Sequence, residues 1–419
     1  MWLSTKKLFS SKVVINGAWL YVLQIFNTVI PLLTLPYITR VLGSTAYGNF
    51  SITLNIIGYA QVIVNYGFDL SGASKISKYD KIQDRSELFS NILTCKVILS
   101  ILTFMVIYIG SMVNLTPIND NITLLILYIV VIGTSLQQTW VFHGLQVMKF
   151  ITIVNIVSRT ISVVLIFLLV KNSNQLYLYS ALYGLTFLIN GIISMIIVKY
   201  QFKFNYYMPS IKSIWNELID GWHIFISSIM GKLFSSFGIT VLGFVSLDSV
   251  VGIYSAIQKI PLLVLMGYSP IGQALFPYYS KKFSVSFKSG VVEVIKLTKI
   301  IILIMIPISF GLILGSKWLV DLLYGSEYSK DYILMIPLVF WLFFSVLNNL
   351  FGTQILVASG NVKEYSSAFK YGVLISVILN ITLGLKMEAL GVAIATALSE
   401  GSLMVIMMIN IKKKYEIDR

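Results

Sequence analysis

The chain contains twelve long apolar stretches, and basic residues crowd into every second gap between them. A stretch of about 18 or more apolar residues can cross a bilayer as a helix, because a helix satisfies its own backbone hydrogen bonds in lipid. Composition agrees, since 57% of the 419 residues are hydrophobic and only 11% are charged. The sequence therefore predicts an all-α polytopic membrane protein. The predicted spans are 13–39, 49–70, 89–111, 122–142, 150–170, 178–198, 222–245, 251–279, 297–316, 332–357, 368–385 and 389–411.

The distribution of Lys and Arg predicts how these spans are oriented. Gaps on the side of the N-terminus hold clusters at 6–12, 75–85, 199–212, 281–299 and 412–419. The opposite gaps hold only Arg40, Lys171, Lys317, Lys330 and Lys386. By the positive-inside rule, both chain ends lie in the cytoplasm. The net charge of +14 follows this topology instead of forming one patch, so we expect no nucleic-acid partner.

Six spans in each half predict two lobes, an N-lobe over 1–200 and a C-lobe over 222–419. Weak internal similarity at an offset of about 204 residues, such as Gly48 with Gly252, is consistent with parallel repeats. Such repeats are related by a pseudo-twofold axis along the membrane normal, with substrate between the lobes. The segment 201–221 mixes basic and aromatic residues. It is either an amphipathic helix on the cytoplasmic leaflet or a linker that only fixes topology.

Four cations lie inside predicted spans: Lys96, Arg159, Lys232 and Lys259. A charge at the bilayer centre costs about 3 kcal/mol, so it normally faces a partner or a wet cavity. Arg159 and Lys232 lie about 14 to 15 Å into their spans, near the midplane. They are expected to line a polar cavity or to form a buried structural pair. Lys96 and Lys259 lie about 10 to 12 Å from a span end, from which a long side chain can also reach the interface.

Other polar residues complete the candidate site. Arg40, at the outer end of the first span, is expected to join the cations. A net positive cavity suits an anionic ligand such as a phosphate or pyrophosphate. Glu400 lies in the middle of the twelfth span. It is either a site for a coupling cation or proton together with Asn380 and Thr396, or the counter-ion of a buried Lys or Arg.

Several kinds of catalytic centre are excluded by the sequence. There is no glycine-rich phosphate loop, because Gly231-Lys232 is followed by leucine and lacks the upstream glycine. One cysteine, Cys95, and two histidines, His143 and His223, leave no basis for a zinc centre. No acidic cluster suits Mg²⁺ within the spans. We therefore predict that the chain is not an enzyme and holds no metal or other cofactor, with coupling to H⁺ or Na⁺ left open.

The segment from Pro31 to Phe50, PLLTLPYITRVLGSTAYGNF, carries a family resemblance. Its Pro-Tyr-Ile-Thr-Arg-Val-Leu-Gly run, followed by Tyr47-Gly48, resembles the opening of polysaccharide-unit flippases of the MOP exporter superfamily, the Wzx-type O-antigen and capsule translocases. Twelve spans, cytoplasmic ends and a length near 420 extend the likeness over the whole chain. The motif says little about which sugar is carried.

The resemblance implies a flippase in the bacterial plasma membrane. Such a protein moves undecaprenyl-pyrophosphate-linked oligosaccharides to the outer leaflet by alternating access, with its lobes in a V around a cationic cavity. Arg40, Arg159, Lys232 and Lys259 would line that cavity, and only Arg40 rests on the motif. A polysaccharide polymerase and a chain-length regulator are the implied protein partners. Sodium coupling as in lipid II flippases is in doubt, because the seventh span carries Lys232 and no acid near its centre.

Two alternatives remain. A multidrug and toxin extruder of the same superfamily exports cations and would be expected to use an acidic cavity. A membrane polymerase or ligase acting on the same lipid-linked sugar would be expected to carry a large external loop, whereas the external gaps here are short.

Overall fold

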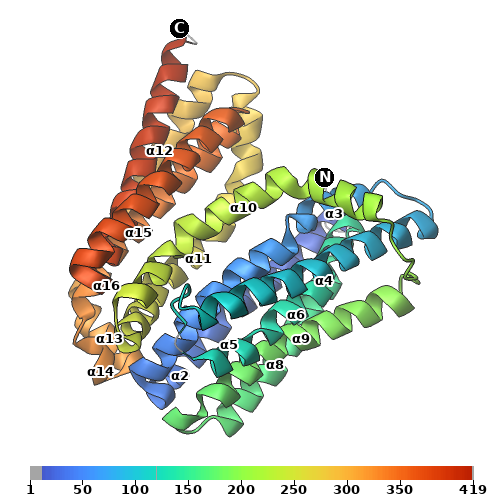
Figure 1. Ribbon diagram of the computed structural model, residues 1–419. Helices are drawn as coiled ribbons and strands as arrows, with labels where there is room; N and C mark the ends of the chain where they lie inside the picture. The colour runs from blue at the N-terminus through green and yellow to red at the C-terminus, as the bar shows by residue number, and fades with distance from the viewer. Residues whose placement is uncertain (1–11, 119, 418–419) are drawn as a thin grey trace. The chain divides into compact units, whose positions relative to one another are not determined.

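The computed structural model describes residues 12–118 and 120–417, and its regular structure over these residues is entirely helical (Figure 1). Ten helical segments in this part of the chain are long and apolar enough to cross a membrane. The predicted all-α membrane class is confirmed. Ten segments account for twelve predicted spans because the first two lie in one helix, α2 (Lys12–Asn65), and the last two in another, α16 (Val362–Ile417).

Each of these long helices contains a break in place of the predicted loop. In α2 the break is at Gly43, with φ 76° and ψ 173°. In α16 it is at Glu388, with φ 48° and ψ −127°. Positive φ costs glycine little, so Gly43 suits a sharp change of direction. The predicted gaps, 40–48 and 386–388, are helical on both sides of these breaks, and each helix resumes directly after its break.

The chain divides into two compact units. Unit 1 comprises Met1–Thr34 and Asn49–Lys232, and unit 2 comprises Leu35–Gly48 and Leu233–Arg419. Helices α2 and α10 (Ile211–Val245) therefore each contribute to both units. The lobe boundaries and the symmetry axis expected from the sequence stay predictions.

Unit 1 is built around α9, which packs against α5, α6 and α8 (Figure 1). Its core on the cytoplasmic side of the predicted topology includes Phe68, Ile92, Trp140 and Phe142, all at most 1% exposed. The helices of unit 1 besides α2 and α10 are α3 (Phe68–Ile76), α4 (Ile82–Met112), α5 (Asn121–Leu127), α6 (Ile129–Leu136), α7 (Thr139–Gly144), α8 (Met148–Leu169), the short η1 (Ser173–Gln175) and α9 (Leu176–Tyr200).

The predicted fourth span, 122–142, is interrupted, because it is divided among α5, α6 and α7. Gln137 is extended, with φ −67° and ψ 130°, and separates α6 from α7. The Lys96 Nζ donates to the Gln137 carbonyl at 3.2 Å. A cation at a helix C-terminus is favourable, because the last carbonyls carry partial negative charge. Lys96 is only 1% exposed, so it holds this break and does not extend to the interface.

Unit 2 centres on α15, which packs against α11, α12 and α16. Leu342, Val346 and Leu350 form part of its core. A π-helical stretch, η3, continues α15, and such stretches are often found at functional sites. The helices of unit 2 besides α2, α10 and α16 are α11 (Asp248–Phe283), α12 (Phe287–Leu314), α13 (Ser316–Tyr324), α14 (Ser326–Ser329), η2 (Tyr332–Leu334), α15 (Met335–Asn348) and η3 (Asn349–Val357).

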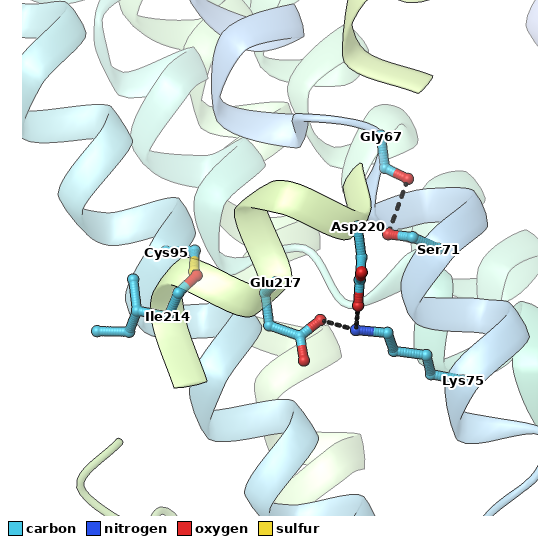
Figure 2. A network of polar contacts seen from close by, with 7 residues as sticks. All are labelled: Gly67, Ser71, Lys75, Cys95, Ile214, Glu217 and Asp220. Carbon is cyan, nitrogen blue, oxygen red and sulfur yellow. Dashed lines mark hydrogen bonds and ion pairs between the residues drawn. The ribbon is translucent and has the colours of Figure 1, made fainter. Parts of the chain in front are cut away.

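Within unit 1, ionic contacts join the first turns of α10 to α3 (Figure 2). The Lys75 ammonium of α3 lies 2.7 Å from a Glu217 carboxylate oxygen and 2.6 Å from one of Asp220. The Cys95 thiol of α4 donates to the Ile214 carbonyl at 3.8 Å. The buried Glu217 thus has a charged partner, which a buried carboxylate requires.

The opposite side of these turns is apolar and exposed. Ile211, Trp215 and Ile219 follow one another at four-residue spacing and are 86%, 64% and 55% exposed. Residues at that spacing share one helix face, and an exposed face with a Trp is typical of a helix at a membrane interface.

Candidate substrate-binding site

Lys232 lies across one face of α2. Its Nζ donates to the Asn55 Oδ1 at 3.3 Å and lies 5.2 Å from the centre of the Tyr59 ring. Gly58 is on the same face, and a Cβ there would lie 2.6 Å from the ammonium. A side chain at this position would therefore displace the ammonium. The amide oxygen accepts a hydrogen bond from the ammonium, and the ring contributes a cation–π contact.

Arg159 on α8 meets α2 at a different residue. Its Nη1 donates to the Asn27 Oδ1 at 2.5 Å. Within the described ranges, no carboxylate lies at ion-pair distance from Arg159, which is half-buried. The same helix is fixed near its start by Thr152, whose hydroxyl donates to the Trp19 carbonyl at 2.8 Å. The guanidinium thus keeps donors available beyond its single neutral partner.

Both asparagine partners lie deep within the predicted membrane region. At about 1.5 Å per residue, Asn27 and Asn55 lie about 24 and 18 Å along α2 from the break at Gly43. The first predicted span ends at residue 39, so Asn27 lies about 18 Å inside its outer end, and both contacts fall within a core about 30 Å thick. The structure therefore places Arg159 and Lys232 in the same unit, each oriented by a polar residue of α2.

Arg40 occupies a different environment, in unit 2. Its Nη2 donates to the carbonyls of Asp321 and Leu322, at 3.4 and 2.5 Å, at the end of α13. Across the Gly43 break, the Glu327 carboxylate accepts from the backbone N–H of Ser44 at 3.2 Å and also from its hydroxyl. Glu327 thus caps the helix that resumes after Gly43, as acidic side chains do at helix N-termini.

A buried tyrosine adds to this contact. Tyr328 of α14 is 0% exposed, and its hydroxyl donates to the Thr39 carbonyl at 3.3 Å. Burial raises the pKa of the Tyr328 phenol, so the hydroxyl stays protonated and remains a donor. We call residues 39–44 with 321–328 the outer clasp. The family-like motif therefore fixes the break in α2, and Arg40 is already bound to two carbonyls.

Lys259 lies on α11 and is half-buried. None of the described residues accepts a hydrogen bond from it in this structure. Arg159 and Lys232 belong to unit 1, whereas Arg40 and Lys259 belong to unit 2.

Glu400 on α16 faces α15 of the same unit. The Ser345 hydroxyl donates to its Oε1 at 2.7 Å, and the Asn348 amide donates to its Oε2 at 2.5 Å. No Lys or Arg of the described chain forms an ion pair with Glu400. Thr396 lines the same cavity as Glu400, whereas Asn380 does not and instead donates to the Ser376 carbonyl at 2.8 Å.

Across residues 12–118 and 120–417, no group of three His, Cys, Asp or Glu is placed to hold a metal ion. The residues that sequence reasoning missed are the neutral partners of the charges: Asn27, Asn55, Tyr59, Ser345 and Asn348. The asparagines could have been identified from the sequence, because an amide within an apolar span needs a polar partner in lipid.

Comparison with known sequences identifies relatives over nearly the whole chain. A family model described as polysaccharide biosynthesis protein matches residues 13–283. A proposed O-antigen transporter of Escherichia coli (strain K12) is 28% identical over 388 residues, which cover 92% of this chain and 93% of that protein. The proposed low-salt glycan biosynthesis flippase Agl15 of Haloferax volcanii is 23% identical, covering 91% of this chain and 79% of that protein.

Solved structures share the fold. The lipid II flippase MurJ, in an inward closed conformation, has a TM-score of 0.74 at 18% identity, over 95% of this chain and 87% of that chain. An inward-facing multidrug resistance MATE transporter of the MOP superfamily has a TM-score of 0.63 at 12% identity, over 93% of this chain and 99% of that chain. The resemblance predicted from residues 31–50 is confirmed: the chain is a membrane protein of the polysaccharide biosynthesis protein family, with the fold of MurJ and the MATE transporters.

Proposed function

We propose that the protein flips undecaprenyl-pyrophosphate-linked oligosaccharide repeat units from the cytoplasmic to the outer leaflet of a bacterial plasma membrane, for O-antigen or capsule synthesis. The observation that carries the proposal is Lys232, held deep in the membrane by the Asn55 amide and the Tyr59 ring over Gly58. Deep cations suit an anionic ligand such as a pyrophosphate.

The proposed pyrophosphate ligands in unit 1 are Arg159 and Lys232, and Lys259 of unit 2 stays a prediction from the sequence. Arg159 offers the paired N–H geometry that matches phosphate oxygens, and a lysine ammonium acts as a compact charge. Arg40 is left out of this set because its guanidinium already binds the carbonyls of the outer clasp. The family match and the names of the two sequence relatives support a lipid-linked glycan as the substrate. Alternating access is part of the proposal and comes from the family resemblance.

The main competing function is export of cationic drugs, since a MATE transporter has the same fold. Arg159 argues against that function, because it is a deep cation with no carboxylate partner among the described residues. A cavity that exports cations would gain from acids at this depth instead.

The test is mass spectrometry of lipid-linked oligosaccharides in a strain that lacks the gene. A membrane-impermeant sugar probe then assigns the leaflet in which they collect. Build-up of a pyrophosphate-linked repeat unit on the cytoplasmic side, reversed by the wild-type gene, is expected. Build-up on the outer side would instead indicate a polymerase or ligase, and no build-up would favour drug export.

A further inference from the structure

Unit 2 contains a cavity of about 370 Å³ with a single carboxylate in its wall. It is lined by residues of α10, α11, α15, η3 and α16, all belonging to unit 2. The polar side chains that line it are Ser235, Tyr268, Ser269, Trp341, Ser345, Asn349, Thr396, Ser399 and Glu400. A polar cavity of this size has room for several water molecules. All its lining residues belong to unit 2, whereas Lys232 and Arg159 belong to unit 1.

Glu400 is 9% exposed and lies far from either end of its helix. At about 1.5 Å per residue it is about 18 Å along α16 from the break at Glu388, towards the middle of the membrane. An ionised carboxylate at this depth is costly unless it is hydrogen-bonded or paired. Its hydrogen-bond donors are the neutral side chains of Ser345 and Asn348, which would stabilise the full negative charge of an ionised Glu400.

The donors around Glu400 favour a proton as its ligand over a metal ion. The Asn348 amide reaches both the carboxylate at 2.5 Å and the Glu400 carbonyl at 2.9 Å through N–H groups. Trp341 lines the same cavity as this carboxylate. Na⁺ and other hard cations are bound by several oxygen ligands, whereas N–H groups directed at the carboxylate repel a cation there. A proton needs only one free lone pair of the carboxylate.

The other titratable groups near Glu400 are tyrosines, so Glu400 is the acidic side chain among the described residues that line this cavity. From α11 the titratable group is Tyr268, whose hydroxyl donates to the Asn349 Oδ1 at 3.2 Å. From the first half of α16 it is Tyr365, which lies near enough for the charge of Glu400 to act on it. The lining residues from α10 and α15 carry no titratable group, and none of the described residues that line the cavity is Lys, Arg, His or a second acid.

We propose that Glu400 is a proton-binding site that exchanges its proton with water in the cavity of unit 2, and that this proton is the coupling ion for transport. Ionised Glu400 accepts from Ser345 and Asn348, and the protonated carboxyl keeps one acceptor oxygen for them. Protonation removes the charge and so weakens the contact between α15 and α16. The coupling part rests on the proposed function, whereas proton binding does not.

Infrared difference spectroscopy of the purified full-length protein in nanodiscs tests proton binding directly. Between acidic and neutral pH, the wild type should lose the carbonyl band of a protonated carboxyl and gain carboxylate absorption. Glu400→Gln should lack the part of these bands that Glu400 contributes, because the other acids titrate in both proteins. Glu293→Gln is the matched control, because Glu293 lies in the same unit but pairs with Lys282 at 3.3 Å outside the cavity, and it should keep the bands.

Ser345→Ala is a second variant that keeps Glu400, so proton binding can still be tested if Glu400→Gln misfolds. Loss of one donor to the ionised form should move the midpoint of the bands to higher pH. Identical spectra for the wild type and Glu400→Gln, or an unmoved midpoint in Ser345→Ala, would overturn the proton site.

The coupling part is tested by flipping of a pyrophosphate-linked lipid in proteoliposomes with an imposed pH gradient. Flipping by the wild type should respond to the gradient, whereas flipping by Glu400→Gln should not. An equal response in both would refute coupling through Glu400. Absence of flipping by the wild type would count against the proposed function and so against coupling, while the infrared titration would still decide whether Glu400 binds a proton.

Discussion

Replacement of Lys232 by glutamine is the sharpest test of the cationic site. Glutamine keeps a polar group on α10 but removes the charge, and its shorter chain cannot repeat the contact with Asn55 over Gly58. A hydrogen bond that involves a charged group contributes about 1.5 to 3 kcal/mol. Loss of one such contact to a pyrophosphate should therefore weaken its binding about 10- to 150-fold.

The assay measures binding of undecaprenyl pyrophosphate to the purified protein in nanodiscs, beside the amount of surface polysaccharide in a complemented deletion strain. Lys232→Arg keeps the charge and should retain most binding. Lys281→Gln, which removes an exposed lysine at the end of α11, controls for net charge. We expect Arg159→Gln to behave like Lys232→Gln.

Protein abundance in the membrane must stay normal for the result to be interpreted. Removing a deep cation lowers the cost of insertion, so neither variant is expected to reduce abundance. Wild-type affinity and normal polysaccharide in both Lys232→Gln and Arg159→Gln would refute the assignment of these cations to the substrate.

Three further substitutions test other parts of the structure. Gly58→Ala should leave the protein folded but displace the Lys232 ammonium, which would lie 2.6 Å from the new Cβ, so the amount of surface polysaccharide should fall. Gly17→Ala is the control in the same helix and should have no effect, because a Cβ there meets nothing within 4 Å. Lys75→Met should lower the free energy of unfolding by about 2 kcal/mol because it leaves buried Glu217 with less compensation, and an unchanged thermal midpoint would contradict this. Arg40→Gln should lower the free energy of unfolding by about 1 to 2 kcal/mol by removing donors from two carbonyls, and recovery of the thermal midpoint in Arg40→Lys would show that a hydrogen-bonding cation suffices.

The membrane-spanning pattern could be predicted from the sequence because lipid imposes it. Long apolar stretches must be helical in a bilayer, and these segments are helical in the structure. The sequence did not predict that the first two spans form one helix with a break at Gly43. The break depends on Glu327, which is distant in sequence and caps the backbone of Ser44. The interruption at Gln137 likewise depends on a contact from Lys96, on another helix.

Depth could be predicted for Arg159 and Lys232, but their partners could not. Counting residues from a span end places a charge in the membrane, since the rise of a helix is constant. Choosing Asn27 for one cation and Asn55 for the other requires the packing of α8 and α10 on α2. Arg40 shows the limit of a motif, because its role in the outer clasp depends on carbonyls 281 and 282 residues away.

The neutral partners bear on how a flippase can release its cargo. A carboxylate beside Arg159 would compensate its charge permanently, and a pyrophosphate would then have to displace that partner. An asparagine oxygen fixes the direction of the guanidinium and leaves most of its charge to attract an anion. The cost of about 3 kcal/mol for a deep charge is then relieved when substrate binds and returns when it leaves. A site of this kind favours exchange over tight retention. Introducing an acid at Asn27 should therefore keep Arg159 in place while it reduces pyrophosphate binding, and unchanged binding in Asn27→Asp would contradict this reasoning.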